Sequence, residues 1–206
     1  MRQSSIVQRC IAESLDNYLF FCTLTYNNDS LPVIETSSGF SIRYADMRDF
    51  TLMMKRLRKR PGFDRTCRYL VVSELGEKNG RPHFHALLVV PKLPGDTFVT
   101  IMQLETWLFE NVLAEWRRNY GSTRSPVYRP LCTYTRRWIR GELKTNYDLH
   151  YLNPRSSQNG VSDVAFYVSK YMLKRSDREK RLQQALKLNL VTYDDDGKPD
   201  YTEYED

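Results

Sequence analysis

Two histidines stand two residues apart in the segment GRPHFHALLVV, residues 80–90, and the chain has only three histidines among its 206 residues. The apolar content of this segment is typical of a buried strand. Residues i and i+2 of a strand point to the same face, so we expect His83 and His85 to lie side by side. Two neighbouring imidazoles can hold one divalent metal ion, but two ligands rarely suffice. The third histidine, His150, is expected to be an ordinary surface or core residue.

A carboxylate on the preceding strand is the expected third ligand. If the connection around Lys78–Asn79 is a symmetric hairpin turn, Glu74 lies opposite His83 and on the same face. A register shifted by one residue would turn Glu74 away and leave Glu77 as the ligand. Two imidazoles and a carboxylate, with positions left open, are typical of a catalytic site for Mg²⁺, Mn²⁺ or Zn²⁺. The alternative is a pair of partly buried structural histidines, which is the commoner explanation of an isolated H-x-H pattern.

A second group of reactive side chains shares one face of a predicted helix over residues 162–174. At about 100° per residue, this face carries Tyr167, Lys170, Tyr171 and Lys174. A tyrosine hydroxyl, with an ordinary pKa of about 10, must lose its proton before it attacks, and both a metal ion and ammonium groups favour the phenolate. Such a tyrosine is suited to attack a phosphodiester and form a phosphotyrosine ester. The alternative is that the tyrosines anchor the helix in the core while the lysines are solvated.

The remaining elements must position these two groups. Helices are predicted over residues 4–17, 46–59, 103–119, 162–174 and 176–189. Strands are predicted over residues 18–26, 68–74, 83–90, 127–135 and 145–152. The short loop with glycines between residues 74 and 83 favours a hairpin. This order predicts an α+β domain in which helices pack on an antiparallel sheet.

The charge of the chain is unevenly divided. The formal net charge is +6, but residues 193–206 hold seven acids and one lysine, which leaves 30 basic and 18 acidic residues in residues 1–192. We expect residues 1–192 to form one domain with a polyanionic partner, and residues 193–206 to form a disordered acidic tail that screens it. Candidate contacts with a nucleic-acid backbone, for each of which the alternative is a solvated surface charge, are Arg56, Arg58, Lys59, Arg136, Arg137 and Arg140.

Cysteine usage and hydropathy indicate the compartment. The four cysteines are scattered, without a C-x-x-C motif, which suits a reducing environment. No apolar run is long enough to span a bilayer, and the first residues lack the apolar core of a signal peptide. These features predict a soluble protein of the cytoplasm with no membrane partner.

Three segments together resemble a known family. FCTLTYNNDSLP, SELGEKNGRPHFHALL and FYVSKYMLK are similar, in this order, to the three motifs of HUH-type rolling-circle replication initiators. The resemblance is closest to the initiators of microviruses of the gokushovirus type, and it spans residues 18–175. It implies a ferredoxin-like or RRM-like sheet with the H-x-H motif on a central strand. It also implies an endonuclease that nicks one DNA strand, stays on the 5′ phosphate through tyrosine and later rejoins the strand.

The resemblance assigns roles to the residues singled out above. His83, His85 and Glu74 become ligands of Mg²⁺ or Mn²⁺, and Tyr167 and Tyr171 become a pair of nucleophiles. Lys170 and Lys174 match the basic positions of the last motif.

The implied partner is single-stranded origin DNA in a bacterial host. The chain has no G-x-x-x-x-G-K-[ST] motif, so the helicase, like the polymerase, is expected to come from the host or the phage. Two alternatives stay open at this point. One is a single-tyrosine HUH transposase, and the other is a noncatalytic module that binds single-stranded DNA or RNA.

Overall fold

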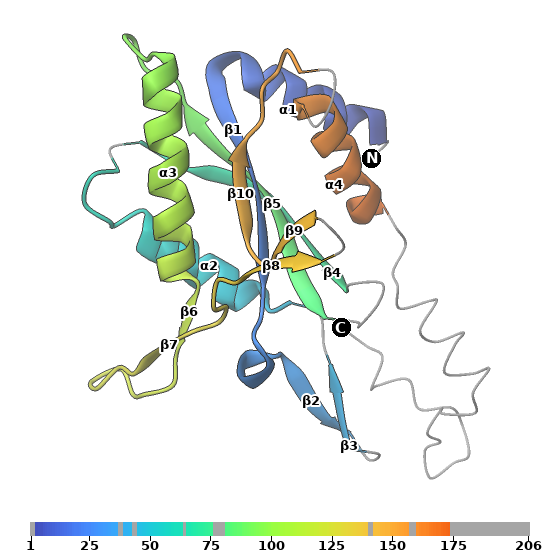
Figure 1. Ribbon diagram of the computed structural model, residues 1–206, viewed down its shortest axis with the longest axis vertical. Helices are drawn as coiled ribbons and strands as arrows, with labels where there is room; N and C mark the ends of the chain where they lie inside the picture. Colours follow the sequence, from blue (N-terminus) through green and yellow to red (C-terminus); the bar gives the residue numbers. More distant parts are fainter. Residues whose placement is uncertain are drawn as a thin grey trace, which may run out of the picture.

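Four antiparallel strands form the central sheet of the computed structural model. Their order is β10 (Asp148–Tyr151), β1 (Asn17–Thr25), β5 (Pro82–Pro91) and β4 (Arg68–Leu75) (Figure 1). The predicted α+β class and antiparallel sheet are confirmed, and β5, which carries the histidine pair, is an inner strand. The structure describes residues 3–36, 39–42, 45–63, 65–75, 81–139, 142–156 and 160–173.

Helices cover both faces of this sheet, so its inner strands are apolar on both sides. One face packs against α2 (Met47–Leu57) and α3 (Phe98–Glu115), and the other packs against α1 (Gln3–Asp16) and α4 (Val161–Leu173). Alternate residues of β1 serve the two sides: Phe20 and Leu24 face α2 and α3, whereas Leu19 and Phe21 face α1 and α4. Burial of both faces explains why β1 and β5 are continuous apolar runs.

The helices facing the first core begin at clear capping residues. Asp46 caps α2 by accepting a hydrogen bond from the backbone N–H of Arg48, and the helix stops before Gly62, whose φ is +82°. Helix α3 was predicted over residues 103–119 but spans Phe98–Glu115. It begins early because Thr97 and Thr100 form a capping box, in which threonine replaces the usual glutamate or glutamine.

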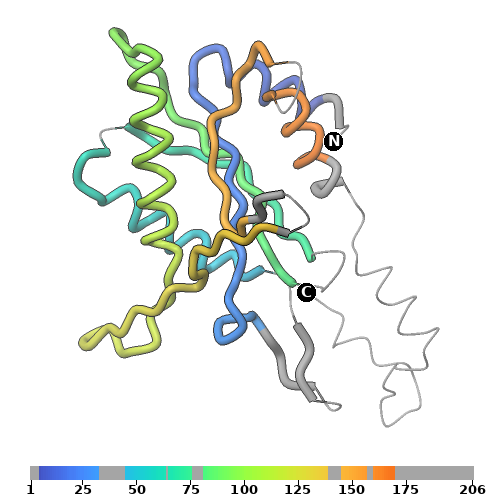
Figure 2. The backbone as a smooth tube through the Cα atoms, in the orientation of Figure 1, coloured from blue at the N-terminus to red at the C-terminus, as the bar shows by residue number. Residues whose placement is uncertain are grey.

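Several short hairpins extend from the sheet. They comprise β2 (Val33–Thr36) with β3 (Gly39–Ile42), β6 (Arg117–Asn119) with β7 (Tyr128–Pro130), and β8 (Arg136–Ile139) with β9 (Glu142–Thr145). A 3₁₀ turn over Asn28–Ser30 follows β1. The strand predicted over residues 127–135 is wrong for most of its length, because only β7 lies within it. The β6–β7 hairpin leaves the body beyond the end of α3 (Figure 2).

Two predicted segments fall outside the residues that the structure describes: the helix over residues 176–189 and the acidic tail over residues 193–206. Within the described part of the chain, no helix is both long enough and apolar enough to cross a bilayer.

Candidate metal and tyrosine site

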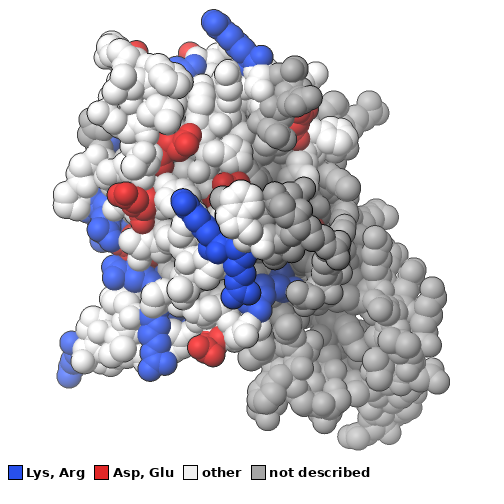
Figure 3. Space-filling view, viewed as in Figure 1, with Lys and Arg blue, Asp and Glu red and all other residues white. Residues whose placement is uncertain are grey.

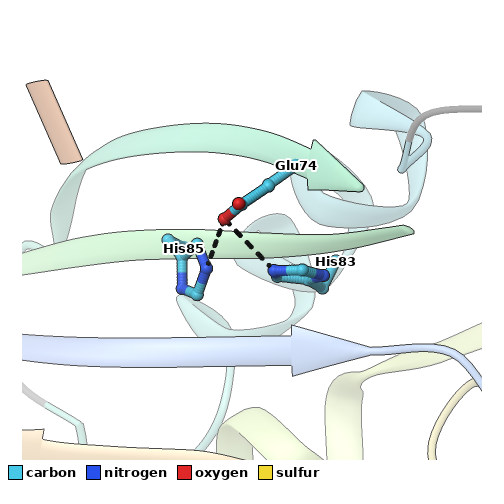
Figure 4. Close-up of side chains that lie close together, drawn as sticks. All are labelled: Glu74, His83 and His85. Atoms are coloured by element: carbon cyan, nitrogen blue, oxygen red, sulfur yellow. Dashed lines mark hydrogen bonds and ion pairs between the residues drawn. The ribbon is translucent and has the colours of Figure 1, made fainter. Parts of the chain in front are cut away.

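The register of the β4–β5 hairpin brings Glu74 to the histidine pair. Glu74 pairs with His83, as the symmetric turn predicted, and His85 lies two residues further along the same strand. One ligand atom from each of the three side chains lies within 4.8 Å of the others. Figure 4 shows the carboxylate of Glu74 reaching across from β4 toward both imidazoles. Glu74, His83 and His85 are called the metal triad below.

The triad shares a single focus. Oε2 of Glu74 lies 3.3 Å from Nε2 of His83 and 3.1 Å from Nε2 of His85. The second nitrogen of each ring has its own partner: Nδ1 of His83 lies 3.0 Å from the carbonyl oxygen of Arg81, and Nδ1 of His85 lies 3.2 Å from Oγ1 of Thr23. Because a carbonyl oxygen only accepts, Nδ1 of His83 must donate, which leaves the Nε2 lone pair available for a metal ion.

Burial keeps His85 in the neutral form that metal binding needs. Its side chain is 8% exposed, and its ring stacks on Phe21 with a centroid distance of 5.5 Å and an interplanar angle of 12°. Burial, and secondly the neighbouring His83, lowers the pKa of His85 to about 4. A neutral imidazole is a ligand and an imidazolium is not, so His85 is ready to bind a cation across the neutral pH range.

The donor set fits a divalent cation. Two imidazole nitrogens and one carboxylate oxygen converge, and three protein ligands leave coordination positions for water or for phosphate oxygens. The residues could hold Mg²⁺, Mn²⁺ or Zn²⁺, and the ligand set does not distinguish among them. Glu77, the reserve ligand, lies outside the described residues.

Helix α4 carries a tyrosine to the triad from far along the chain. Oη of Tyr167 lies 3.2 Å from Nε2 of His85, and the two rings meet edge to face with centroids 5.1 Å apart. The helix is held by Val161, Ala165 and Val168, which are buried against α1 and the sheet. Because these apolar residues fix the helix, Tyr167 is directed at the site while its side chain stays partly exposed, at 37%.

The start of α4 also depends on a glycine. A Cβ at Gly160 would collide with the backbone carbonyl of Ser156, so only glycine allows the chain to turn here. Tyr171 lies one turn beyond Tyr167 in the same helix. Its side chain, that of Lys170 and all of Lys174 lie outside what the structure describes, and their roles stay predictions.

An open groove lies beside the metal triad. It has a volume of about 590 Å³ and is lined mainly by threonine and asparagine side chains, with Arg81 and Arg137 as its cations. Thr25, one of its lining residues, is paired with His83 in the sheet. Arg137 was predicted from its charge, whereas Arg81 was missed although it stands two residues before His83. The groove offers hydrogen-bonding groups and positive charge directly next to the triad.

The predicted basic contacts differ in how far they are engaged by the protein. Arg56 donates to the carboxylate and carbonyl of Glu115, and Arg58 donates to the carbonyl of Cys67. Lys59 and Arg136 are exposed, and Arg136 donates to the hydroxyl of Tyr134. Arg140 lies outside the described residues. Contact with nucleic acid stays a prediction for all of these residues.

His150 lies on β10, the strand next to β1. Its Nδ1 is 3.0 Å from a carboxylate oxygen of Asp148, and the hydrogen bond with that carboxylate raises the pKa of His150 despite its partial burial. Among the described residues, the cluster able to hold a metal ion is Glu74 with His83 and His85, and His150 is not part of it.

Comparison with known proteins gives one match. A family model for the replication-associated protein ORF2 matches residues 19–176, which include the metal triad and helix α4. No curated protein and no solved structure matches the chain significantly.

Proposed function

Because the chain belongs to the replication-associated protein ORF2 family, a family of replication initiators, we propose that it nicks and rejoins one DNA strand at a rolling-circle origin. The observation that supports this best is the 3.2 Å between Oη of Tyr167 and Nε2 of His85, which joins a nucleophile to the metal triad. Neither a metal site alone nor a tyrosine alone would favour phosphoryl transfer over other chemistry.

The residues support a balanced transfer step. Tyr167 gives up its hydroxyl proton, its oxygen forms a bond to phosphorus, and the bond from phosphorus to the 3′ oxygen breaks. The leaving 3′ oxygen takes up a proton, which yields a free 3′ hydroxyl and a 5′-phosphotyrosine ester. A divalent cation held by the metal triad supplies positive charge for the non-bridging phosphate oxygens. The adjacent groove, with Arg81 and Arg137, is where the single strand would enter.

Tyr171 is proposed as the second nucleophile. It follows Tyr167 by one helical turn, so both can serve one site, and a second tyrosine can attack a regenerated origin while the first still holds DNA. Lys170 and Lys174 are proposed to favour the phenolate and to neutralise phosphate. The replicon is proposed to be a microvirus-type phage that replicates in the bacterial cytoplasm, with Mg²⁺ or Mn²⁺ as the metal and with a helicase and a polymerase from the host or the phage.

Covalent capture tests the proposal. The protein is incubated with Mn²⁺ and a random-sequence pool of single-stranded DNA labelled at the 3′ end, and the products are separated under denaturing conditions. We expect a labelled protein–DNA adduct, because the 3′ fragment stays on the tyrosine. Tyr167→Phe should reduce the adduct by at least about a hundredfold, since the phenyl ring keeps the packing but has no nucleophile. The double change Tyr167→Phe/Tyr171→Phe should abolish it.

Matched variants separate the alternatives. His83→Ala should abolish the adduct while single-stranded DNA still binds, whereas His150→Ala, which removes the histidine outside the metal triad, should leave the adduct unchanged. An adduct that survives the double tyrosine change would mean another nucleophile. An adduct that is insensitive to Tyr171→Phe in both cleavage and rejoining would favour a single-tyrosine enzyme. DNA binding without any adduct would favour the noncatalytic module.

A further inference from the structure

The β6–β7 hairpin with its loop, residues 117–130, is called the ribbon below, and its composition is unusual for a surface hairpin. It contains no acidic residue, and residues 122–130 are all exposed. In Figures 1 and 3 it lies at the lower left, where basic side chains gather on the surface. Its four basic residues are Arg117, Arg118, Arg124 and Arg129.

The base of the ribbon is fixed to the body by two buried carboxylates. Arg118 binds Asp49 on α2 through both carboxylate oxygens, and the Asp49 side chain is 4% exposed. Arg117 lies 3.0 Å from the carboxylate of Glu115, at the end of α3. These contacts use two of the four arginines for structure. Among the described residues, no carboxylate lies within ion-pair distance of the other two, Arg124 and Arg129.

The loop at the tip of the ribbon has a defined backbone. The side-chain oxygen of Asn119 accepts hydrogen bonds of 2.9 Å from the backbone N–H groups of Gly121 and Val127. A Cβ at Gly121 would collide with the carbonyl oxygen of Ser125, so this position requires glycine. Arg124 is therefore presented from an ordered loop rather than from a free chain end.

The tyrosines of the ribbon are engaged by arginine. The guanidinium of Arg129 lies 5.4 Å from the ring centroid of Tyr120, and that of Arg117 lies 4.5 Å from the ring centroid of Tyr128. Proteins that bind single strands use open aromatic faces on which bases stack. The ribbon instead presents guanidinium groups and, in the tip loop, exposed hydroxyls, which are the groups that contact phosphates.

We propose that the ribbon binds the phosphate backbone of duplex DNA next to the single-stranded nicking site. The inference rests on the proposed function in taking origin DNA as the ligand. A two-stranded ribbon fits the major groove of B-DNA, which is about 12 Å wide. The ribbon also forms one wall of an open groove of about 990 Å³, whose other wall is the start of α2 with the exposed Arg48. One strand of a duplex lies in this groove while the tip reaches across the double helix.

Binding measured without cleavage tests the ribbon. Fluorescence anisotropy is recorded in EDTA with a duplex of about 20 base pairs and with one of its strands alone, over a series of salt concentrations. Arg124→Ala/Arg129→Ala should weaken duplex binding by about tenfold or more and lower the slope of log K against log salt by about 2, because each phosphate contact contributes about 0.9. Binding of the single strand should change less than about twofold, because its site is the groove beside the metal triad.

A control and a second variant complete the test. Arg9→Ala/Arg155→Ala removes the same charge from exposed positions outside the ribbon and should leave the slope unchanged. Gly121→Ala keeps every charge but displaces the tip loop, so it should also weaken duplex binding. Equal losses for duplex and single strand, or no loss for either, would overturn the proposal. Adduct formation on single-stranded DNA should persist in all three variants, so the ribbon can fail while the nicking activity stands, and the reverse.

Discussion

The hydroxyl of Thr23 lies 3.2 Å from Nδ1 of His85, on the strand beside the histidine pair. It cannot reach Nε2, the nitrogen that faces Glu74, so it acts on the metal triad only by orienting the ring. An oriented imidazole with its proton on Nδ1 presents the Nε2 lone pair without further cost, which raises metal affinity. Thr23 is therefore a positioning residue.

Replacing Thr23 by valine tests this role. Thr23→Val keeps the shape and the β-branched side chain but removes the hydroxyl, so the affinity for Mn²⁺ should fall by about 10- to 100-fold, as is typical for such partners of metal-bound histidines. Isothermal titration with Mn²⁺ measures the change, and circular dichroism checks the fold. Thr23→Ser, which retains the hydroxyl, should restore most of the affinity. Equal Mn²⁺ affinity in the wild type and Thr23→Val would show that the ring is fixed by its packing on Phe21 instead.

At the residue scale, the sequence predicted the triad but not its supports. The two-residue spacing of His83 and His85 and the symmetric turn to Glu74 are local, so strand geometry alone was enough. Thr23 is 62 residues from His85 and became visible only when β1 and β5 were paired. Tyr167 is further still, 82 residues away, and its helical face could be predicted while its distance from the metal site could not.

At the element scale, Glu115 joins three parts of the fold. Its buried carboxylate, at the end of α3, receives Arg56 and Arg60 from the α2 region and Arg117 from β6. Burial alone would raise the pKa of Glu115, but the hydrogen bond from Arg60 and the charge of Arg117 outweigh burial, and the pKa is lowered. A carboxyl whose pKa is lower in the folded state stabilises the fold above its unfolded pKa, and this contribution is lost as the pH falls.

Glu115→Gln should therefore show a pH-dependent loss of stability. At neutral pH the change leaves three arginines around an uncharged amide, and the free energy of unfolding should fall by about 3 kcal/mol. The difference from the wild type should shrink as the pH is lowered from about 5 to about 3, because the unfolded carboxyl titrates near pH 4.3. Urea unfolding across this range measures it. Glu110→Gln, an exposed position on the same helix, should cost little at any pH, and a pH-independent loss for Glu115→Gln would contradict the ion-pair account.

The same cluster explains why surface charge was harder to interpret than the sheet. Helix α2 was predicted nearly to its true ends, because its cap, its apolar stripe and its terminating Pro61–Gly62 are all local signals. The partners of its arginines are distant: Arg56 meets Glu115 59 residues away. Charge at a helix end can serve a ligand or an interior carboxylate, and only the tertiary structure distinguishes the two.

At the scale of the whole molecule, charge is separated along the chain. Residues 1–192 carry an excess of basic residues, and residues 193–206, which lie outside the described part, carry seven acids. Deleting residues 193–206 should tighten nonspecific DNA binding at low salt, because the tail competes with phosphate for the basic surface. The gain should vanish at high salt, where such competition is screened. Anisotropy with a nonspecific duplex measures it, and unchanged affinity at low salt would show that the tail does not compete.

The order of the site residues along the chain affects how the protein gains its activity during synthesis. The metal triad belongs to the β4–β5 hairpin, whereas Tyr167 belongs to the last described helix, which docks on α1 and the sheet. A nascent chain therefore completes its cation-holding half first. Until the α4 segment has emerged from the ribosome and packed, the protein has no phenol with which to cut DNA, so prematurely terminated products that lack α4 cannot break the strand that they bind.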